Sequence, residues 1–423
     1  MAYAAAAGDF AARPVAPPGV IALQRALVWL AGASGAIVFI EPSPYELVTL
    51  VSAAVFIATG VRLRIVFVPL LLLLFLLNLG YTICAVPLLG DSVIASWIAT
   101  SWYMAVTVMF FALVMAEDTA ARLDMLRRGL VVGAVVASLA GVAGYFHAVP
   151  GGYDLLTLYG RARGTFKDPN VFGAFLLLPS LLVLQNVVTA HFAKALRSAI
   201  ALLIMALAIL LAFSRAAWGG LVATAAFMLV VMVLTSTPRS ERSRIVTMTL
   251  AAVVAGVLLI VVLLSFPSIA DMFQQRASFD QSYDEGRFGR FGRHILGAQM
   301  ALDLPFGIGP LQFHHYFPED THNSYLNAFM SGGWLSGICY PTLVFATVIL
   351  GFRHLFVRVP WQRSYIAIFA AFLGTVGESF IIDTDHWRHF FMMLGAMWGM
   401  FAAAGSHARH EYRSRAAIGT RSS

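Results

Sequence analysis

Runs of about 20 apolar residues recur along almost the whole chain, and each is long enough to cross a hydrocarbon core about 30 Å thick. Of the 423 residues, 60% are hydrophobic and only 12% are charged, about half of the charged fraction of a soluble domain. These runs predict an all-α, polytopic integral membrane protein that forms a single membrane domain over residues 1–423. We expect about twelve transmembrane helices, near residues 20–40, 45–60, 65–85, 93–116, 129–148, 171–190, 199–213, 217–235, 246–266, 323–350, 364–382 and 389–404.

The formal net charge of +7 does not indicate a nucleic-acid-binding protein, because most basic residues are scattered through short connections between apolar runs. That distribution is typical of cytoplasmic loops under the positive-inside rule. Both termini are then expected in the cytoplasm, with the first span as an uncleaved anchor. The basic connections are Arg62/Arg64, Arg122/Arg127/Arg128, Lys194/Arg197, Arg239/Arg242/Arg244, Arg353/Arg358/Arg363 and the tail with Arg409, Arg413, Arg415 and Arg421.

The opposite side of the membrane should be poor in arginine, yet three of its connections carry basic residues. Topology does not require them, so a bound anion on this face is the simplest explanation. Cations that reach lipid headgroups are the alternative for any one of them. The residues are Arg161, Arg163 and Lys167; Arg215; and Arg276, Arg287, Arg290 and Arg293.

The long polar segment 267–321 carries Arg287, Arg290 and Arg293 at every third position. A helix would spread these three guanidinium groups over about 120° of one side. The glycines between them weaken a helix, so the alternative is a loop that presents backbone N–H groups to an anion. Both conformations suit phosphate, which arginine binds with paired hydrogen bonds.

The segment 161–170 ends just before an apolar run. Pro169 disfavours helix at Asp168 and so predicts a loop-to-helix transition there. Thr165 and Asn170 can hydrogen-bond the start of the helix, and a helix N-terminus adds partial positive charge. A capped helix entry with surface cations is the alternative.

His322 and Asn323 open the apolar run that follows the long polar segment. A histidine at the membrane edge can be neutral and accept a proton at physiological pH. An interfacial histidine without chemistry is the usual case, but His322 directly follows an arginine-bearing segment. Gly332 and Gly333 can kink the run that follows.

The last turn on this face, from Asp383 to Arg388, has the ligand types of a metal site. We expect a salt-bridged anchor instead, and no metal or cofactor. Glu378, inside the preceding run, is expected to pair with an arginine. Cys84 and Cys339 lie in apolar runs, which argues against a disulfide or a zinc site.

In these motifs the chain resembles the O-antigen ligase and polymerase family of bacterial envelope glycosyltransferases. The likeness covers residues 160–405. Its motifs are Arg163-Gly-Thr-Phe-Lys-Asp-Pro-Asn170, Ser214-Arg215, the Gly-Arg segment around Arg290, Leu304-Pro-Phe-Gly-Ile-Gly-Pro310 and His322-Asn323. The ligase signature is matched at His322, Asn323 and Gly333, whereas Ser336 replaces its final threonine.

The resemblance implies a GT-C-like glycosyltransferase of the bacterial inner membrane with its site facing the periplasm. The implied donor is a glycan on undecaprenyl pyrophosphate, and the acceptor is a hydroxyl of lipid A-core sugar or of another lipid-linked glycan. We hypothesise a metal-independent, inverting transfer in which His322 takes the acceptor proton. Arg163, Arg215 and Arg290 would neutralise the leaving pyrophosphate. The further expected phosphate contacts are Arg161, Lys167, Arg287 and Arg293, with Asn170, Asn323 and Arg388 in support.

Two alternatives remain from the sequence. Two arginine-rich segments, 149–170 and 267–321, favour an O-antigen or exopolysaccharide polymerase of the same family, whereas the His-Asn to Gly spacing slightly favours a ligase. A transporter of an anionic solute or lipid-linked sugar would place ionisable groups nearer the bilayer midplane and show an internal repeat.

Overall fold

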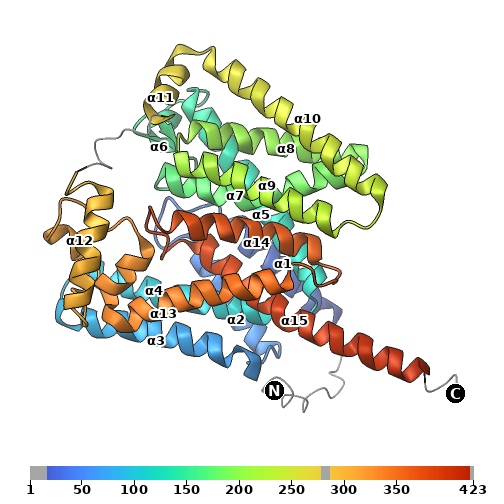
Figure 1. Ribbon diagram of the computed structural model, residues 1–423, viewed down its shortest axis with the longest axis horizontal. Helices are drawn as coiled ribbons and strands as arrows, with labels where there is room; N and C mark the ends of the chain where they lie inside the picture. The colour runs from blue at the N-terminus through green and yellow to red at the C-terminus, as the bar shows by residue number, and fades with distance from the viewer. Residues whose placement is uncertain (1–16, 278–285, 420–423) are drawn as a thin grey trace.

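The computed structural model describes residues 17–277 and 286–419 and is almost entirely helical. In the described chain, twelve helices correspond one to one to the predicted spans (Figure 1). They are α1 (Pro18–Ser34), α2 (Pro44–Ala58), α3 (Val68–Ala85), α4 (Ser92–Met115), α5 (Thr119–Tyr145), α7 (Pro169–Thr189), α8 (Phe192–Leu211), α9 (Arg215–Thr235), α10 (Arg239–Leu264), α13 (Ser324–His354), α14 (Gln362–Glu378) and α15 (Arg388–Gly419).

Eight helices of the described ranges are long and apolar enough to cross a membrane, which confirms the predicted all-α, multi-pass membrane fold. The other four predicted spans lie on helices that do not meet this criterion. Helices α1 and α14 have 17 residues and α2 has 15. At 1.5 Å per residue, 17 residues extend about 25 Å, less than the hydrocarbon thickness. The eight are α3 with its flanking 3-10 turns (Ile65–Leu88), α4, α5, α7, α8, α9, α10 and α13.

Helix α7 forms the centre of the bundle and α10 its periphery. In α7, 83% of the apolar window is buried, against 6% in α10. Figure 1 shows α7 between α8, α9 and α14, with α10 along one edge. Helices α1 and α5, α3 and α13, and α4 and α15 pack as further pairs.

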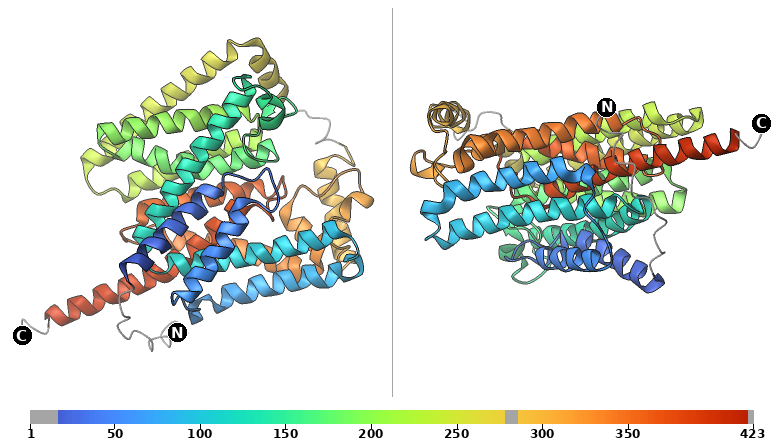
Figure 2. Two further views of the ribbon diagram at one scale, coloured as in Figure 1. Left: turned by 180° about the vertical axis from the view of Figure 1, so that it is seen from behind. Right: turned by 90° about the horizontal axis from the view of Figure 1, so that it is seen from below.

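The predicted polar segment 267–321 is partly helical, and so is the segment before α7. The first contains α11 (Pro267–Ala277), α12 (Arg290–Asp303) and the 3-10 turn Phe313–His315. Helix α12 runs crosswise at the end of the bundle (Figures 1 and 2). Before α7 lie α6 (Gly152–Leu156) and a hairpin of β1 (Thr157–Leu158) and β2 (Arg161–Ala162). Its turn residues Tyr159 and Gly160 both have positive φ, as a type I′ turn requires.

Helix α13 is kinked at Gly332 and Gly333. Gly333 has φ 62° and ψ −162°, a backbone region that is almost restricted to glycine. The Trp334 N–H freed by this kink donates to the carbonyl of Pro305 at 2.8 Å, and Ile308 N–H donates to the Met330 carbonyl at 2.8 Å. A Cβ on Gly333 would lie 2.4 Å from the Pro305 oxygen. The kink therefore docks the 304–310 motif onto α13.

Candidate functional site

The connections that carry the candidate residues meet at one end of the bundle. Val38 N–H, between α1 and α2, donates to the Thr165 carbonyl before α7 at 2.9 Å. Ser324 N–H, at the start of α13, donates to the Ser379 carbonyl after α14 at 2.9 Å. Arg388, after the α14–α15 connection, donates from Nε to Glu46 of α2 at 2.8 Å. Segments that are far apart in the sequence thus form one polar surface.

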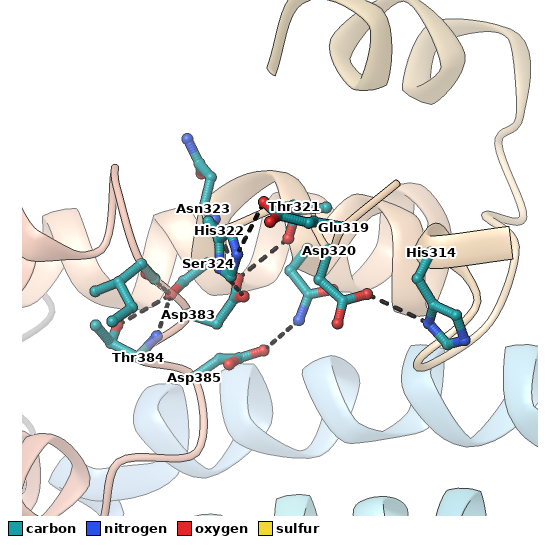
Figure 3. A network of polar contacts seen from close by, with 12 residues as sticks. His314, Glu319, Asp320, Thr321, His322, Asn323, Ser324, Asp383, Thr384 and Asp385 are labelled. Carbon is teal, nitrogen blue, oxygen red and sulfur yellow. Dashed lines mark hydrogen bonds and ion pairs between the residues drawn. The ribbon is translucent and has the colours of Figure 1, made fainter. Parts of the chain in front are cut away.

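His322 lies in this surface beside Asp383, which comes from the α14–α15 connection (Figure 3). His322 Nδ1 is 3.5 Å from Asp383 Oδ2, and the histidine side chain is 37% exposed. Asp383 Oδ1 accepts hydrogen bonds at 3.1 Å from the Thr321 hydroxyl and from Asn323 N–H. Asp383 therefore holds the residues on both sides of His322 and faces its ring.

The backbone of His322 has a φ of 46°, in the left-handed region. Few non-glycine residues adopt it, and such strain often marks functional positions. Asn323 begins α13 as its N-cap: its side chain accepts from Leu326 N–H at 3.0 Å and donates to the Phe380 carbonyl at 3.2 Å. The expected supporting role of Asn323 thus has a structural basis in the orientation of this helix start.

A network of hydroxyl groups joins the α14–α15 connection to α13. Ser324 Oγ lies 3.0 Å from Thr384 Oγ1 (Figure 3), and Ser379 Oγ lies 2.6 Å from the same atom. Deeper in the protein, Asn327 donates to Asp385 Oδ2 at 2.7 Å. These contacts fix the position of Asp383 relative to His322.

The arginine triplet does not present three equivalent side chains. Helix α12 begins at Arg290, with Gly289 as its N-cap, so Arg287 lies outside the helix. Arg293 is 2% exposed; it donates to Glu319 at 2.7 Å and to the Phe288 carbonyl at 3.0 Å. Arg293 therefore ties α12 to the segment before His322, and its burial does not support the expected phosphate contact. Arg287 is exposed beside the Phe288 ring.

His294 also connects α12 to the candidate base. Its Nε2 lies 2.9 Å from the Thr321 carbonyl, so the neutral ring donates this hydrogen bond. Burial lowers the pKa of His294, and the positive charges of Arg290 and Arg293 lower it further. Glu319, the partner of Arg293, also lies 3.9 Å from His322 Nε2.

The basic residues before α7 have three different environments. Arg161 is 6% exposed and donates to the Ala212 carbonyl at 2.8 Å and to Asn170 at 2.7 Å. It therefore ties β2 to the end of α8, and its expected phosphate role is not supported by its burial. Arg163 donates to three backbone carbonyls of its own connection. Lys167 forms an ion pair with Glu41 at 2.6 Å.

Arg215 is the first residue of α9, capped by Ser214, whose hydroxyl accepts from Ala217 N–H at 3.4 Å. Two of the expected phosphate contacts, Arg215 and Arg290, thus stand at the first position of a helix. The positive end of a helix dipole favours an anion at such a place.

The turn from Asp383 to Arg388 is anchored by ion pairs, as expected. Arg388 pairs with Glu46 and lies 3.5 Å from Glu41. Within the described ranges, no cluster of three or more His, Cys, Asp or Glu residues could hold a metal ion.

The prediction that Glu378 pairs with an arginine is wrong. Glu378 is 5% exposed, and neither carboxylate oxygen has a hydrogen-bond partner among the described residues. Its neighbour on α9 is Gly220, whose Cβ, if present, would lie 3.4 Å from Oε1. Sequence spacing alone could not show that the adjacent helix offers a glycine there.

Ser336, which replaces the threonine of the ligase signature, is fully buried, and its hydroxyl donates to the Leu77 carbonyl of α3 at 2.7 Å. The retained hydroxyl is thus a packing contact between α3 and α13. Two acidic residues beside His322 were not predicted from the sequence as part of the site: Glu319 and Asp383. The signal for Asp383 was its place in a polar turn on the same face as His322.

The comparisons with known proteins support the motifs that lie between residues 200 and 340. A family model described as O-antigen ligase matches residues 200–340, which include α9 to α12, His322 and the α13 kink. No curated protein matches the chain. The resemblance of this multi-pass membrane protein to the O-antigen ligase and polymerase family is thereby confirmed.

Proposed function

We propose that the protein is a glycosyltransferase that moves a glycan from undecaprenyl pyrophosphate to an acceptor hydroxyl on the periplasmic face, in the manner of an O-antigen ligase. The observation that carries this proposal is the pairing of His322 with Asp383 at 3.5 Å. An Nδ1–H directed at the carboxylate leaves Nε2 with a lone pair for an incoming proton. A base positioned in this way contributes about 10²–10⁴-fold to a transfer rate.

In the proposed reaction, the acceptor oxygen attacks the anomeric carbon while the bond from that carbon to the phosphate oxygen breaks. His322 takes the hydroxyl proton, and the lipid pyrophosphate leaves with added negative charge. Direct displacement inverts the anomeric centre. The positions of Arg215 and Arg290 at the first residues of α9 and α12 support a role for both in stabilising that charge. Arg163 and the exposed Arg287 are further candidates, whereas Arg161 and Arg293 position the backbone.

The test uses the full-length protein reconstituted in lipid, without an ion gradient. It is given a lipid-pyrophosphate-linked glycan with either lipid A-core or a second lipid-linked glycan. Release of lipid pyrophosphate together with a glycosylated lipid A-core supports the ligase, and a lengthened lipid-linked glycan supports the polymerase. Substrate movement without release of lipid pyrophosphate would indicate a transporter and overturn the proposal.

The variants His322→Ala and Arg290→Ala should each lose transfer, while His315→Ala serves as the control. His315 is an exposed histidine on the 3-10 turn before His322. Near wild-type transfer by both His322→Ala and Arg290→Ala would refute the assigned roles.

A further inference from the structure

A cavity of about 170 Å³ opens at the same end of the bundle as His322. It lies between the α1–α2 connection, the start of α7 and the start of α15. For comparison, an engineered protein cavity of about 150 Å³ holds a benzene molecule. The cavity therefore has room for one six-membered ring.

Four aromatic side chains contribute to the wall of this cavity. Tyr45, Phe166, Phe175 and Trp387 line it, and the Trp387 ring is 5.3 Å from the His389 ring. Aromatic faces suit the flat, C–H-rich side of a ring that also carries hydroxyl groups at its edge.

His389 lines the cavity and carries a buried polar atom without a partner in the described chain. Its side chain is 8% exposed, and its Nε2 has no hydrogen-bond partner among the described residues. A buried polar atom without a partner is costly in a folded protein. A ligand hydroxyl in the cavity would supply that partner.

The charged groups around the cavity already compensate one another. Lys167 Nζ lies 2.6 Å from Glu41, Arg388 pairs with Glu46, and Asp168 accepts from Asn170 N–H at 2.7 Å to cap α7. A pyrophosphate would have to break these pairs. The lining therefore favours an uncharged, hydroxyl-bearing ring over an anion.

The cavity and the proposed catalytic base are both contacted by residues of the α14–α15 connection. Asp383 contacts His322, and Trp387 of the same connection lines the cavity. Four residues of extended chain cover at most about 14 Å, so the two places lie within that reach on the same polar surface.

We propose that this cavity binds one uncharged sugar ring of a glycan substrate, which deepens the function proposed above and rests on it. The aromatic wall holds the ring face, His389 binds a ring hydroxyl, and the compensated charges exclude the pyrophosphate. The glycan is thereby held with one end near His322.

Binding is measured by saturation-transfer NMR on the full-length protein in lipid nanodiscs, with the methyl glycosides of glucose, galactose, mannose and N-acetylglucosamine. His389→Phe removes the polar atom, and Gly35→Val fills the lining. Gly35 has φ −59°, and a Cβ there would meet the Tyr45 ring at an ordinary 3.6 Å. Gly405→Val on α15, where a Cβ meets nothing within 4 Å, is the matched control.

We expect at least one glycoside to bind the wild type, Gly405→Val and His322→Ala with the same affinity. The cavity variants His389→Phe and Gly35→Val are compared only if they keep the wild-type unfolding temperature. In each variant that does, we expect binding to be at least tenfold weaker. Absence of binding to the folded wild type, or unchanged binding in a folded cavity variant, overturns the proposal. If neither cavity variant folds, labelling of the wild type by photoreactive glycosides followed by peptide mapping decides: labelling of the residues that line the cavity supports the site and its absence overturns it.

Transfer assays separate this proposal from the proposed function and identify the source of the ring. An increase in the KM for the acceptor in the cavity variants assigns the ring to the acceptor, and an increase in the KM for the donor assigns it to the donor. If the wild type binds glycosides in the cavity but releases no lipid pyrophosphate, the proposed function fails and the sugar site stands.

Discussion

Asp383 and His322 come from different connections, after α14 and before α13, yet their side chains face each other at 3.5 Å. The same carboxylate accepts hydrogen bonds from Thr321 and Asn323, the two neighbours of His322. This arrangement orients the imidazole ring, and in the reaction proposed above the Asp383 carboxylate is the group that faces the imidazolium as it forms.

Asp383→Asn should reduce glycan transfer by up to about 10²–10⁴-fold, the range that a general base contributes. The amide keeps the size of the side chain but cannot stabilise the imidazolium by charge. The measurement is the transfer rate of the reconstituted protein at saturating substrates. Asp320→Asn is the control, because the Asp320 side chain is 46% exposed and lies 3.5 Å from His314. Equal rates for Asp383→Asn and Asp320→Asn would show that the carboxylate does not assist His322.

The helices could be predicted from the sequence far better than the site. Apolar runs of about 20 residues predict helices in a bilayer, because only a helix forms all of its backbone hydrogen bonds within one segment. Whether a polar side chain is buried or exposed depends instead on tertiary packing. Arg293 is buried because α12 packs closely on α13: a Cβ on Gly297 would lie 2.8 Å from Leu326. Arg290, only three residues earlier, begins the helix, and no periodicity in the sequence distinguishes the two arginines.

The variants Arg293→Ala and Arg290→Ala should therefore separate stability from activity. Arg293→Ala removes a buried partner of Glu319, and we expect the free energy of unfolding to fall by about 1–3 kcal/mol. The cost stays below that of a fully buried pair because Glu319 is 50% exposed and can be solvated. Arg290→Ala should lose more transfer than Arg293→Ala, because Arg290 is the arginine proposed to stabilise the leaving pyrophosphate. The opposite pattern would reverse the two assignments.

Gly333→Ala should prevent normal packing of the 304–310 motif. Backbone strain in this region costs about 1–3 kcal/mol, and the added Cβ would lie 2.4 Å from the Pro305 carbonyl oxygen. We expect a lower unfolding temperature and a loss of transfer. Gly256→Ala on α10 is the matched control, since a Cβ there would meet nothing within 4 Å, and alanine at this position should be neutral or stabilising by up to about 1 kcal/mol. A Gly333→Ala protein as stable as Gly256→Ala would contradict the importance of the kink.

His294 should make the stability of the α12 region depend on pH. Burial, together with the charges of Arg290 and Arg293, lowers the pKa of His294 in the folded protein, whereas the unfolded chain binds the proton near the ordinary pKa of about 6.5. The unfolded state therefore takes up a proton first as the pH falls below about 6.5, and the folded state loses stability until the pH reaches the lowered pKa.

The measurement is the unfolding temperature between about pH 7.5 and pH 5 for the wild type and for His294→Gln. Glutamine can retain the donor to the Thr321 carbonyl, 2.9 Å from Nε2 in the wild type, but does not titrate in this range. We expect the wild type to lose more stability on acidification than the variant, with the difference appearing below about pH 6.5. His315→Gln, at an exposed position, should follow the wild-type curve. Parallel curves for the wild type and His294→Gln would show that His294 keeps the same proton affinity in both states.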